Sequence, residues 1–198
     1  MDNAVSRSTR GDVRPTTRVE RRANIPLLDL SELRVIVIDD NEFATILMKR
    51  LLGVMRVTQV TSCLESNAAD DAIRQSKADL AIVDINMPGR SGLEVVHDIR
   101  HGHVGVAKDM CIVVASAHVD IEHVEQARNE GANWVIAKPL SFRTLYDGIT
   151  RAILDDRRFV DSPSYVGPCR RVKNIPLADP ASDRRKLALT TAALLRKC

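Results

Sequence analysis

Residues 80–89 read LAIVDINMPG, a short apolar run that ends at Asp84 and leads into a Pro-Gly pair. Four apolar residues in a row, without the polar alternation of a half-exposed strand, are typical of a strand buried on both faces of a sheet. The Pro88-Gly89 pair then favours a tight turn. The stretch therefore predicts a buried strand that delivers one carboxylate to the edge of a sheet.

Three further apolar runs end in the same way, each at polar side chains. Residues 33–38 precede Asp39 and Asp40, residues 111–115 precede Ser116, and residues 134–137 precede Lys138. Ligands of open α/β sheets bind outside the carboxyl ends of the parallel strands. We therefore expect two acids, a third acid, a hydroxyl and a lysine to meet at one edge of a single sheet.

The segments between these runs carry apolar residues at helical spacing, and Asn41 is suited to cap the first of the helices. The predicted strands are residues 33–38, 57–60, 80–83, 111–115 and 134–137. The predicted helices are residues 43–54, 68–75, 93–99, 121–129 and 142–154. Strict alternation of five strands and five helices indicates a doubly wound α/β fold around a five-stranded parallel sheet.

The distribution of charge divides the chain into three parts. Net charges counted along the sequence are +2 for residues 1–30, −6 for residues 31–156 and +7 for residues 157–198, against +3 for the whole chain. The first part lacks apolar periodicity and is expected to be a disordered basic extension. The middle part is the predicted domain. The last part is expected to be a basic tail with a short amphipathic helix that begins near Ser182.

Composition excludes several classes of protein. Hydrophobic residues make up 44% of the chain, which is enough for a core, and no apolar run approaches the roughly 20 residues that span a membrane. The four cysteines have neither metal-ligand nor disulfide-framework spacing. The five histidines, among them His97, His101 and His103, lack a matched ligand partner and are expected to be surface residues rather than a metal site. We expect a cytoplasmic protein without membrane insertion.

The predicted edge suits phosphoryl chemistry. Three carboxylates repel one another unless a cation joins them, and Mg²⁺ prefers oxygen ligands such as carboxylates and carbonyls. Asp84 is the natural nucleophile, because carboxylates can form aspartyl-phosphate intermediates. Mg²⁺ and the Lys138 ammonium would neutralise the transferring phosphoryl group, and the Ser116 hydroxyl could hydrogen-bond it. The turn at Pro88 could aim the Asn86 carbonyl at the metal.

The chain resembles the receiver domain of two-component response regulators across residues 31–156. Residues 83–94, VDINMPGRSGLE, are close to the phosphoacceptor signature of that family, and residues 131–139, GANWVIAKP, match its lysine motif. The resemblance implies a (βα)5 flavodoxin-like fold. It also implies that Asp84 takes a phosphoryl group from a histidine kinase or phosphotransfer protein and then changes contacts with a downstream protein.

The resemblance assigns roles to the other polar residues as well. Asp40, Asp84 and the Asn86 carbonyl would bind Mg²⁺ directly, with Asp39 acting through water. Ser116 and Lys138 would contact the phosphoryl group.

The chain differs from the family at position 135, three positions before Lys138. Many receivers have an aromatic residue there that swings inward on phosphorylation, whereas this chain has Val135. The neighbouring Trp134 is expected on the opposite face of the sheet, because side chains alternate along a strand. Output is then expected to use the loop 117–121 and the helix after it. His118 lies where the family tunes hydrolysis of the phosphoryl group.

Other functions remain open at this point. No recognisable output domain fits in the last 42 residues, so the chain is expected to be an effectively stand-alone receiver and not an enzyme. The +7 tail could bind nucleic acid in a salt-dependent way, although few aromatic residues there could stack on bases. A phosphate-independent scaffold is a further alternative. An aspartyl-phosphate phosphatase is a less favoured one, because such enzymes usually place the nucleophile after the first strand.

Overall fold

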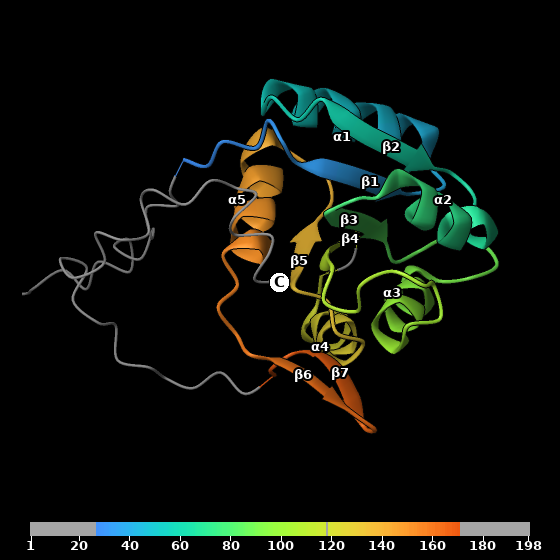
Figure 1. Ribbon diagram of the computed structural model, residues 1–198. Coiled ribbons are helices and arrows are strands. Elements are labelled where there is room, and N and C mark those ends of the chain that lie inside the picture. The colour runs from blue at the N-terminus through green and yellow to red at the C-terminus, as the bar shows by residue number, and fades with distance from the viewer. Residues whose placement is uncertain (1–26, 118, 171–198) are drawn as a thin grey trace, which may run out of the picture.

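The computed structural model describes residues 27–117 and 119–170. Its central feature is a parallel sheet in the order β2-β1-β3-β4-β5, shown in Figure 1. The strands of this sheet are β1 (Arg34–Ile38), β2 (Gln59–Cys63), β3 (Leu80–Asp84), β4 (Cys111–Ser116) and β5 (Trp134–Ala137). The helices are α1 (Glu42–Val54), α2 (Ala69–Ser76), α3 (Gly92–His101), α4 (Ile121–Asn129) and α5 (Phe142–Ile153), with a 3₁₀ turn η1 (Ser66–Ala68) before α2.

The strand order confirms the predicted doubly wound fold. The chain starts in β1, moves outward to β2, and then returns across β1 to build β3, β4 and β5. The direction of winding therefore reverses between β1 and β3. In sheets of this kind the reversal opens a crevice at the carboxyl ends of the two strands, where ligands bind. β3 ends at Asp84, and Asp39 and Asp40 follow β1 directly.

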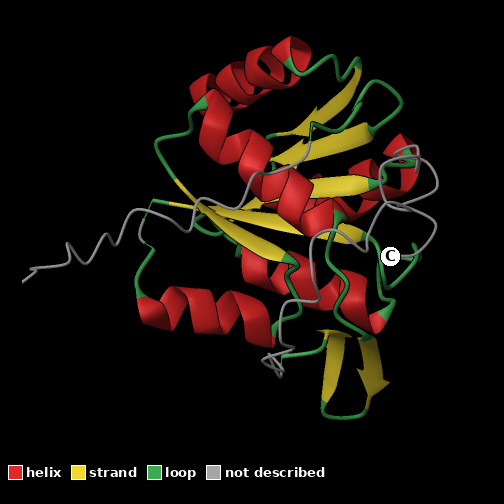
Figure 2. Cartoon of the chain, turned by 90° about the vertical axis from the view of Figure 1, so that its left-hand side faces the viewer, coloured by secondary structure: helices red, strands yellow, loops and turns green. Residues whose placement is uncertain are grey.

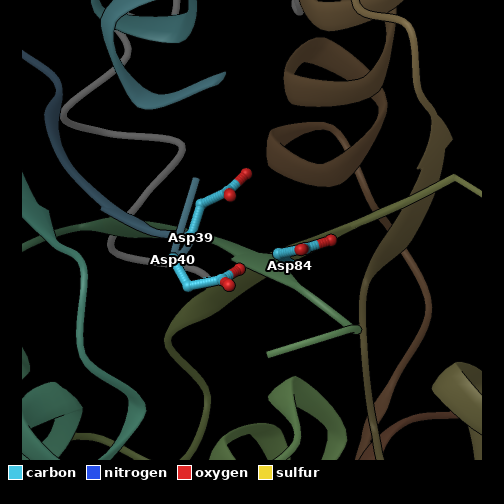
Figure 3. Close-up of side chains that lie close together, drawn as sticks. All are labelled: Asp39, Asp40 and Asp84. Atoms are coloured by element: carbon cyan, nitrogen blue, oxygen red, sulfur yellow. The ribbon is translucent and has the colours of Figure 1, made fainter. Parts of the chain in front are cut away.

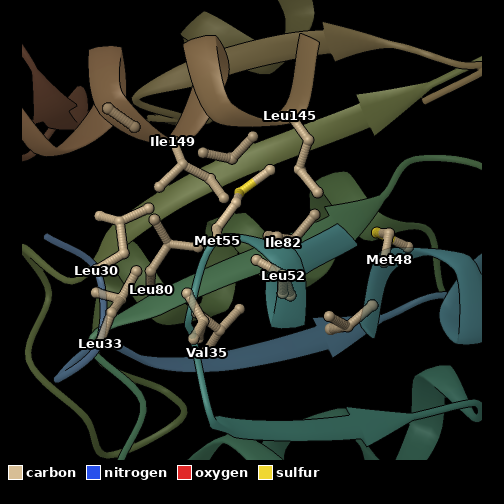
Figure 4. Packing of buried hydrophobic residues seen from close by; sticks show 14 of the residues in the cluster. Leu30, Leu33, Val35, Met48, Leu52, Met55, Leu80, Ile82, Leu145 and Ile149 are labelled. Carbon is tan, nitrogen blue, oxygen red and sulfur yellow. The ribbon is translucent and has the colours of Figure 1, made fainter. Parts of the chain in front are cut away.

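The helices pack in two layers, one on each face of the sheet. On one face, Met48 and Leu52 of α1 pack with Leu145 and Ile149 of α5 over the sheet, as Figure 4 shows. On the other face, α2, α3 and α4 contribute a second buried cluster that includes Ile73. Because β1, β3 and β4 are covered on both sides, almost all of their residues are buried, as their apolar sequences predict.

Two boundaries differ from those predicted from sequence. Leu30 falls in the segment expected to be disordered, yet it is buried in the core beside Leu33; residues 1–26 lie outside the described residues. The strand predicted at residues 57–60 instead spans Gln59–Cys63. Val57 packs into the core below α1, and its N–H donates to the Leu52 carbonyl before the strand begins. The strand itself is a half-exposed edge strand and lacks an apolar signature.

A β-hairpin follows α5, where the sequence predicts only a tail. Its strands are β6 (Phe159–Ser162) and β7 (Tyr165–Pro168), which pair antiparallel and stand apart from the central sheet, as Figure 2 shows. The hydroxyl of Tyr165 donates to the Pro168 carbonyl at 2.6 Å, and its oxygen also lies 3.3 Å from the carbonyl of Arg128 in α4. At Gly167 a Cβ would lie 2.6 Å from the Cα of Gly131, so this close backbone approach requires glycine. The hairpin is thus seated on the end of α4.

The hairpin also covers a buried cation. Arg100 of α3 is fully buried, and the ring of Phe159 lies 5.6 Å from its guanidinium carbon. Its guanidinium donates four hydrogen bonds of 2.6 to 2.9 Å, to the carbonyls of Lys108, Met110 and Gly131 and to the Asn133 side chain. One side chain therefore connects α3 with both segments that lead into β4 and β5.

Two predictions lie outside the described residues. They are the helix expected from Ser182 and the role given to His118. Within the described segments, 27–117 and 119–170, no helix is both long and apolar enough to cross a membrane.

Candidate functional site

Three aspartates converge where β1 and β3 end. Parallel pairing aligns Ile38 with Val83, so Asp39 and Asp40 emerge beside Asp84. One carboxylate oxygen from each of the three residues lies within 4.8 Å of the others, and Figure 3 shows the three side chains side by side. Asp39 and Asp84 are buried, whereas Asp40 is exposed. The structure therefore brings together the acids that the sequence places at this edge.

Asp39 and the start of α1 are held by short-range hydrogen bonds. The Asp39 carboxylate accepts the N–H of Asn41 at 2.9 Å, and the hydroxyl of buried Thr45 donates to the Asp39 carbonyl. The Asn41 side chain in turn accepts the N–H of Ala44, which confirms Asn41 as the cap of α1. These contacts fix the backbone from which Asp39 and Asp40 project.

Lys138 joins two of the acids from the far side of the pocket. It follows β5, and its ammonium nitrogen lies 2.7 Å from Asp39 Oδ2 and 3.0 Å from Asp84 Oδ1. Burial alone would lower the pKa of Lys138, but its hydrogen bonds and charge interactions with the two carboxylates outweigh burial and raise the pKa. The lysine is therefore held in its charged form at the centre of the site.

The ionised form of Asp84 is disfavoured by its surroundings. Burial raises the pKa of its carboxyl, Lys138 lowers it, and the charges of Asp39 and Asp40 add to the rise. The net result is a raised pKa, so one lysine does not fully compensate the desolvation and crowding of the carboxylates. The all-oxygen donor set and this remaining excess of negative charge fit a hard divalent cation such as Mg²⁺.

Ser116 lies at the same edge of the sheet as the acids. Asp84 pairs with Ala115, and Ser116 pairs with Ala137 immediately before Lys138. Ser116 is fully buried, and its carbonyl accepts the Lys138 N–H at 2.7 Å. The remaining residue that the sequence singles out, Asn86, is exposed on the loop after β3.

A buried serine that sequence reasoning missed shapes this loop. The Ser66 hydroxyl, in η1, donates to the Pro88 carbonyl at 2.8 Å and accepts the Arg90 N–H at 3.3 Å. Arg90 in turn forms ion pairs with Asp70 and Asp98. The loop that carries Asn86 is thus tied to α2 and α3. Nothing in the sequence distinguishes Ser66 from a helix-capping serine.

Gly92 is a second residue whose role the sequence did not reveal. It begins α3, and a Cβ at this position would lie 1.8 Å from the carbonyl oxygen of Asp84. Ser91 caps the helix in a reciprocal arrangement with Glu94. The glycine therefore allows the capped end of α3 to abut the backbone of Asp84.

The predicted placement of the tryptophan on β5 is confirmed. Val135 packs against the cluster formed with α2, α3 and α4. Trp134 lies on the opposite side, near Gly148 of α5 and 5.1 Å from the Arg151 guanidinium carbon, and is 39% exposed. An aliphatic residue therefore occupies the face of β5 that leads toward Ser116.

A doubly wound sheet with a lysine-bridged cluster of aspartates at its carboxyl edge is the arrangement expected of a phosphoacceptor domain. The model of the response regulator receiver domain matches residues 35–150, more than half of the chain, and the chain belongs to that family.

Relatives support this assignment. The sensory/regulatory protein RpfC of Xanthomonas campestris pv. campestris is 29% identical over 137 residues, which cover 68% of this chain and 18% of that protein. A cyclic di-GMP phosphodiesterase of Thermotoga maritima is 28% identical over 123 residues, which cover 61% of this chain and 31% of that protein. The chain thus spans less than a third of the length of either relative.

A solved structure supports the fold. The chemotaxis protein CheY4 of Vibrio cholerae matches with a TM-score of 0.56 at 22% identity, over 61% of this chain and 98% of that one. The segment that the family model matches, residues 35–150, is a receiver domain homologous to those of two-component response regulators.

Proposed function

We propose that this chain is a response regulator in which Asp84 accepts a phosphoryl group from a histidine kinase or phosphotransfer protein. The observation that carries the proposal is the meeting of Asp84, two further aspartates and Lys138 in one pocket. The cytoplasmic location expected from the sequence is part of the same proposal.

The chemistry follows from the residues around Asp84. Its carboxylate attacks phosphorus; a phosphorus–oxygen bond forms while the phosphorus–nitrogen bond to the donor histidine breaks. The electron pair stays on the imidazole nitrogen, which takes a proton from water. Mg²⁺, held by Asp40, Asp84 and the Asn86 carbonyl with Asp39 acting through water, would supply positive charge to the transferring group. Lys138 is already within 3.0 Å of Asp84 and supplies a second positive charge.

Ser116 and the elements beyond it would convert phosphorylation into a changed surface. The Ser116 hydroxyl would donate a hydrogen bond to a phosphoryl oxygen. Val135 is too small to act as the swinging aromatic of many receivers, so output would use the β4–α4 connection and α4. The downstream contact would lie on α4, β5 and α5, as the family implies. We assign the chain to signal mediators and not to phosphatases, because its nucleophile follows the third strand.

The test is covalent labelling by acetyl phosphate, followed by intact mass. Wild-type protein should gain one phosphoryl group only when Mg²⁺ is present, and Asp84→Asn should gain none. Asp156→Asn, which changes an exposed aspartate after α5, is the matched control and should label like wild type. Labelling of Asp84→Asn, or failure of wild type with both acetyl phosphate and phosphohistidine donors, would contradict the proposal.

A further inference from the structure

Three histidines gather at the carboxyl-terminal end of α3, away from the acidic pocket at its other end. His97 and His101 are one helical turn apart, and His103 follows Gly102, where α3 ends. Their ring centroids are 3.9 Å apart for His97 and His101, 6.4 Å for His97 and His103, and 6.1 Å for His101 and His103. Three residues that are close together in the sequence therefore also share one patch of surface.

The hydrogen bonds of the three rings define which nitrogen is free to act as a ligand. The Nδ1 atoms of His97, His101 and His103 lie 2.9, 2.8 and 2.9 Å from Glu130 Oε2, the His97 carbonyl and Asp98 Oδ1, respectively. A carbonyl oxygen or an ionised carboxylate can only accept, so each Nδ1 carries the proton. Each neutral ring then bears a lone pair on Nε2. Histidines that ligate metals are typically oriented in this way, by an oxygen on the opposite nitrogen.

The ring spacing is close to that required for coordination. A tetrahedral Zn²⁺ with Zn–N distances of about 2.1 Å separates the centroids of three imidazole ligands by roughly 5 Å. The observed separations of 3.9 to 6.4 Å lie on both sides of this value. Within the described ranges only the three aspartates bring their ligand atoms within 4.8 Å of one another, so the histidines must rotate to bind. They have room to do so, because the side chains of His97 and His103 are 46% and 62% exposed.

The geometry points to a binding site for a divalent transition metal ion, with Zn²⁺ as the ion that best fits three imidazoles and a fourth open position. Nitrogen ligands favour Zn²⁺, Cu²⁺ and Ni²⁺ over Mg²⁺, which distinguishes this site from the all-oxygen pocket around Asp84. Glu130 ends α4, so its contact with His97 links the ion to a second helix. A bound ion therefore fastens the ends of α3 and α4 to each other. The site goes beyond the proposed phosphoacceptor function and does not depend on it.

The test measures Zn²⁺ binding to the full-length metal-free chain by isothermal titration calorimetry. The background carries Cys169→Ser and Cys198→Ser, so that these thiols do not contribute. We expect one site that is weakened at least 10-fold by His97→Gln, His101→Gln or His103→Gln, apart from any Zn²⁺ held by the three aspartates, which these substitutions leave unchanged. Glu130→Gln should weaken it 10- to 100-fold, as expected for a carboxylate that orients a metal-bound histidine. His123→Gln, which changes a partly exposed histidine of α4 outside the cluster, is the matched control and should bind like the background protein.

Two outcomes would overturn the inference. One is the absence of stoichiometric Zn²⁺ binding by the background protein. The other is unchanged affinity in a triple variant of His97, His101 and His103 that circular dichroism shows to be folded. Because these side chains are on the surface, their loss should leave Mg²⁺-dependent labelling of Asp84 intact. The two proposals can therefore fail separately.

Discussion

Substitution of Arg100 by methionine would show how much stability the buried guanidinium provides. Methionine keeps most of the length of the side chain but removes every donor. The carbonyls of Lys108, Met110 and Gly131 then lose the hydrogen bonds that Arg100 makes to them. The Asn133 oxygen keeps a second donor, the N–H of Ile112.

The expected cost can be worked from these contacts. A buried acceptor that loses its donor costs about 1–3 kcal/mol, and relaxation of the segment or entry of water recovers part of it. With three such carbonyls, and with the contact to Phe159 also lost, the free energy of unfolding should fall by about 3–5 kcal/mol in total. That is a large part of the 5–15 kcal/mol by which a domain is typically stable. The melting temperature should fall by roughly 10–15 °C.

Urea unfolding followed by far-UV circular dichroism measures the loss directly. Arg143→Met is the matched control, because that side chain is 71% exposed and makes only a 3.8 Å ion pair with Asp147; its cost should be below about 1 kcal/mol. An Arg100→Met protein that loses less than about 1 kcal/mol, with an unchanged denaturant slope, would refute the reasoning.

Three further predictions concern the phosphoacceptor pocket. Asp84→Asn should stabilise the metal-free protein by about 0.5–2 kcal/mol at neutral pH, because burial raises the pKa of Asp84 in the folded state. The stability advantage of the variant should shrink as pH falls, because Asp84 of wild type then becomes protonated; an advantage that grows toward low pH would contradict the prediction. Mg²⁺ should raise the thermal midpoint of wild type but not of the variant. Lys138→Met should slow labelling by acetyl phosphate by about 10²-fold, as measured by mass spectrometry. Because the pKa of Lys138 is raised in the folded protein, the stability that this lysine contributes should be lost only as the pH rises above 10.5, the ordinary pKa of a lysine. Gly92→Ala should lower the free energy of unfolding by about 1–3 kcal/mol and reduce labelling, because the new Cβ meets the Asp84 carbonyl. Gly53→Ala, where nothing lies within 4 Å of the new Cβ, should instead be stabilising in the same unfolding assay.

The fold was predictable because its three central strands, β1, β3 and β4, are buried on both faces. Runs such as residues 80–83 and 111–115 are apolar throughout, and this signal does not depend on knowing their neighbours. The edge strand β2 is half exposed and mixes polar with apolar residues, so only its position relative to β1 identifies it. The hairpin after α5 was missed for a similar reason, since Gly167 and Pro168 indicate a turn when read alone.

Only part of the candidate site could be predicted from the sequence. Their position at the ends of strands identifies four site residues from the sequence, Asp39, Asp84, Ser116 and Lys138, because parallel strands bring such residues to one edge of the sheet. Their roles in phosphorylation remain predictions. The supporting residues could not be found in this way, because Ser66 acts through a loop more than 20 positions further along the chain. Likewise, the clustering of the histidines depends on how α3 ends.

The hairpin changes where the chain leaves the domain. Without it, the following residues would depart from the end of α5. Instead, the chain departs beside α4, where the Arg128 guanidinium donates to the Arg170 carbonyl and Arg170 bonds the Asn129 side chain. Any displacement of the end of α4 therefore shifts the origin of the segment beyond Arg170 directly. Through the hairpin, Arg170 and the end of α4 are fixed to each other.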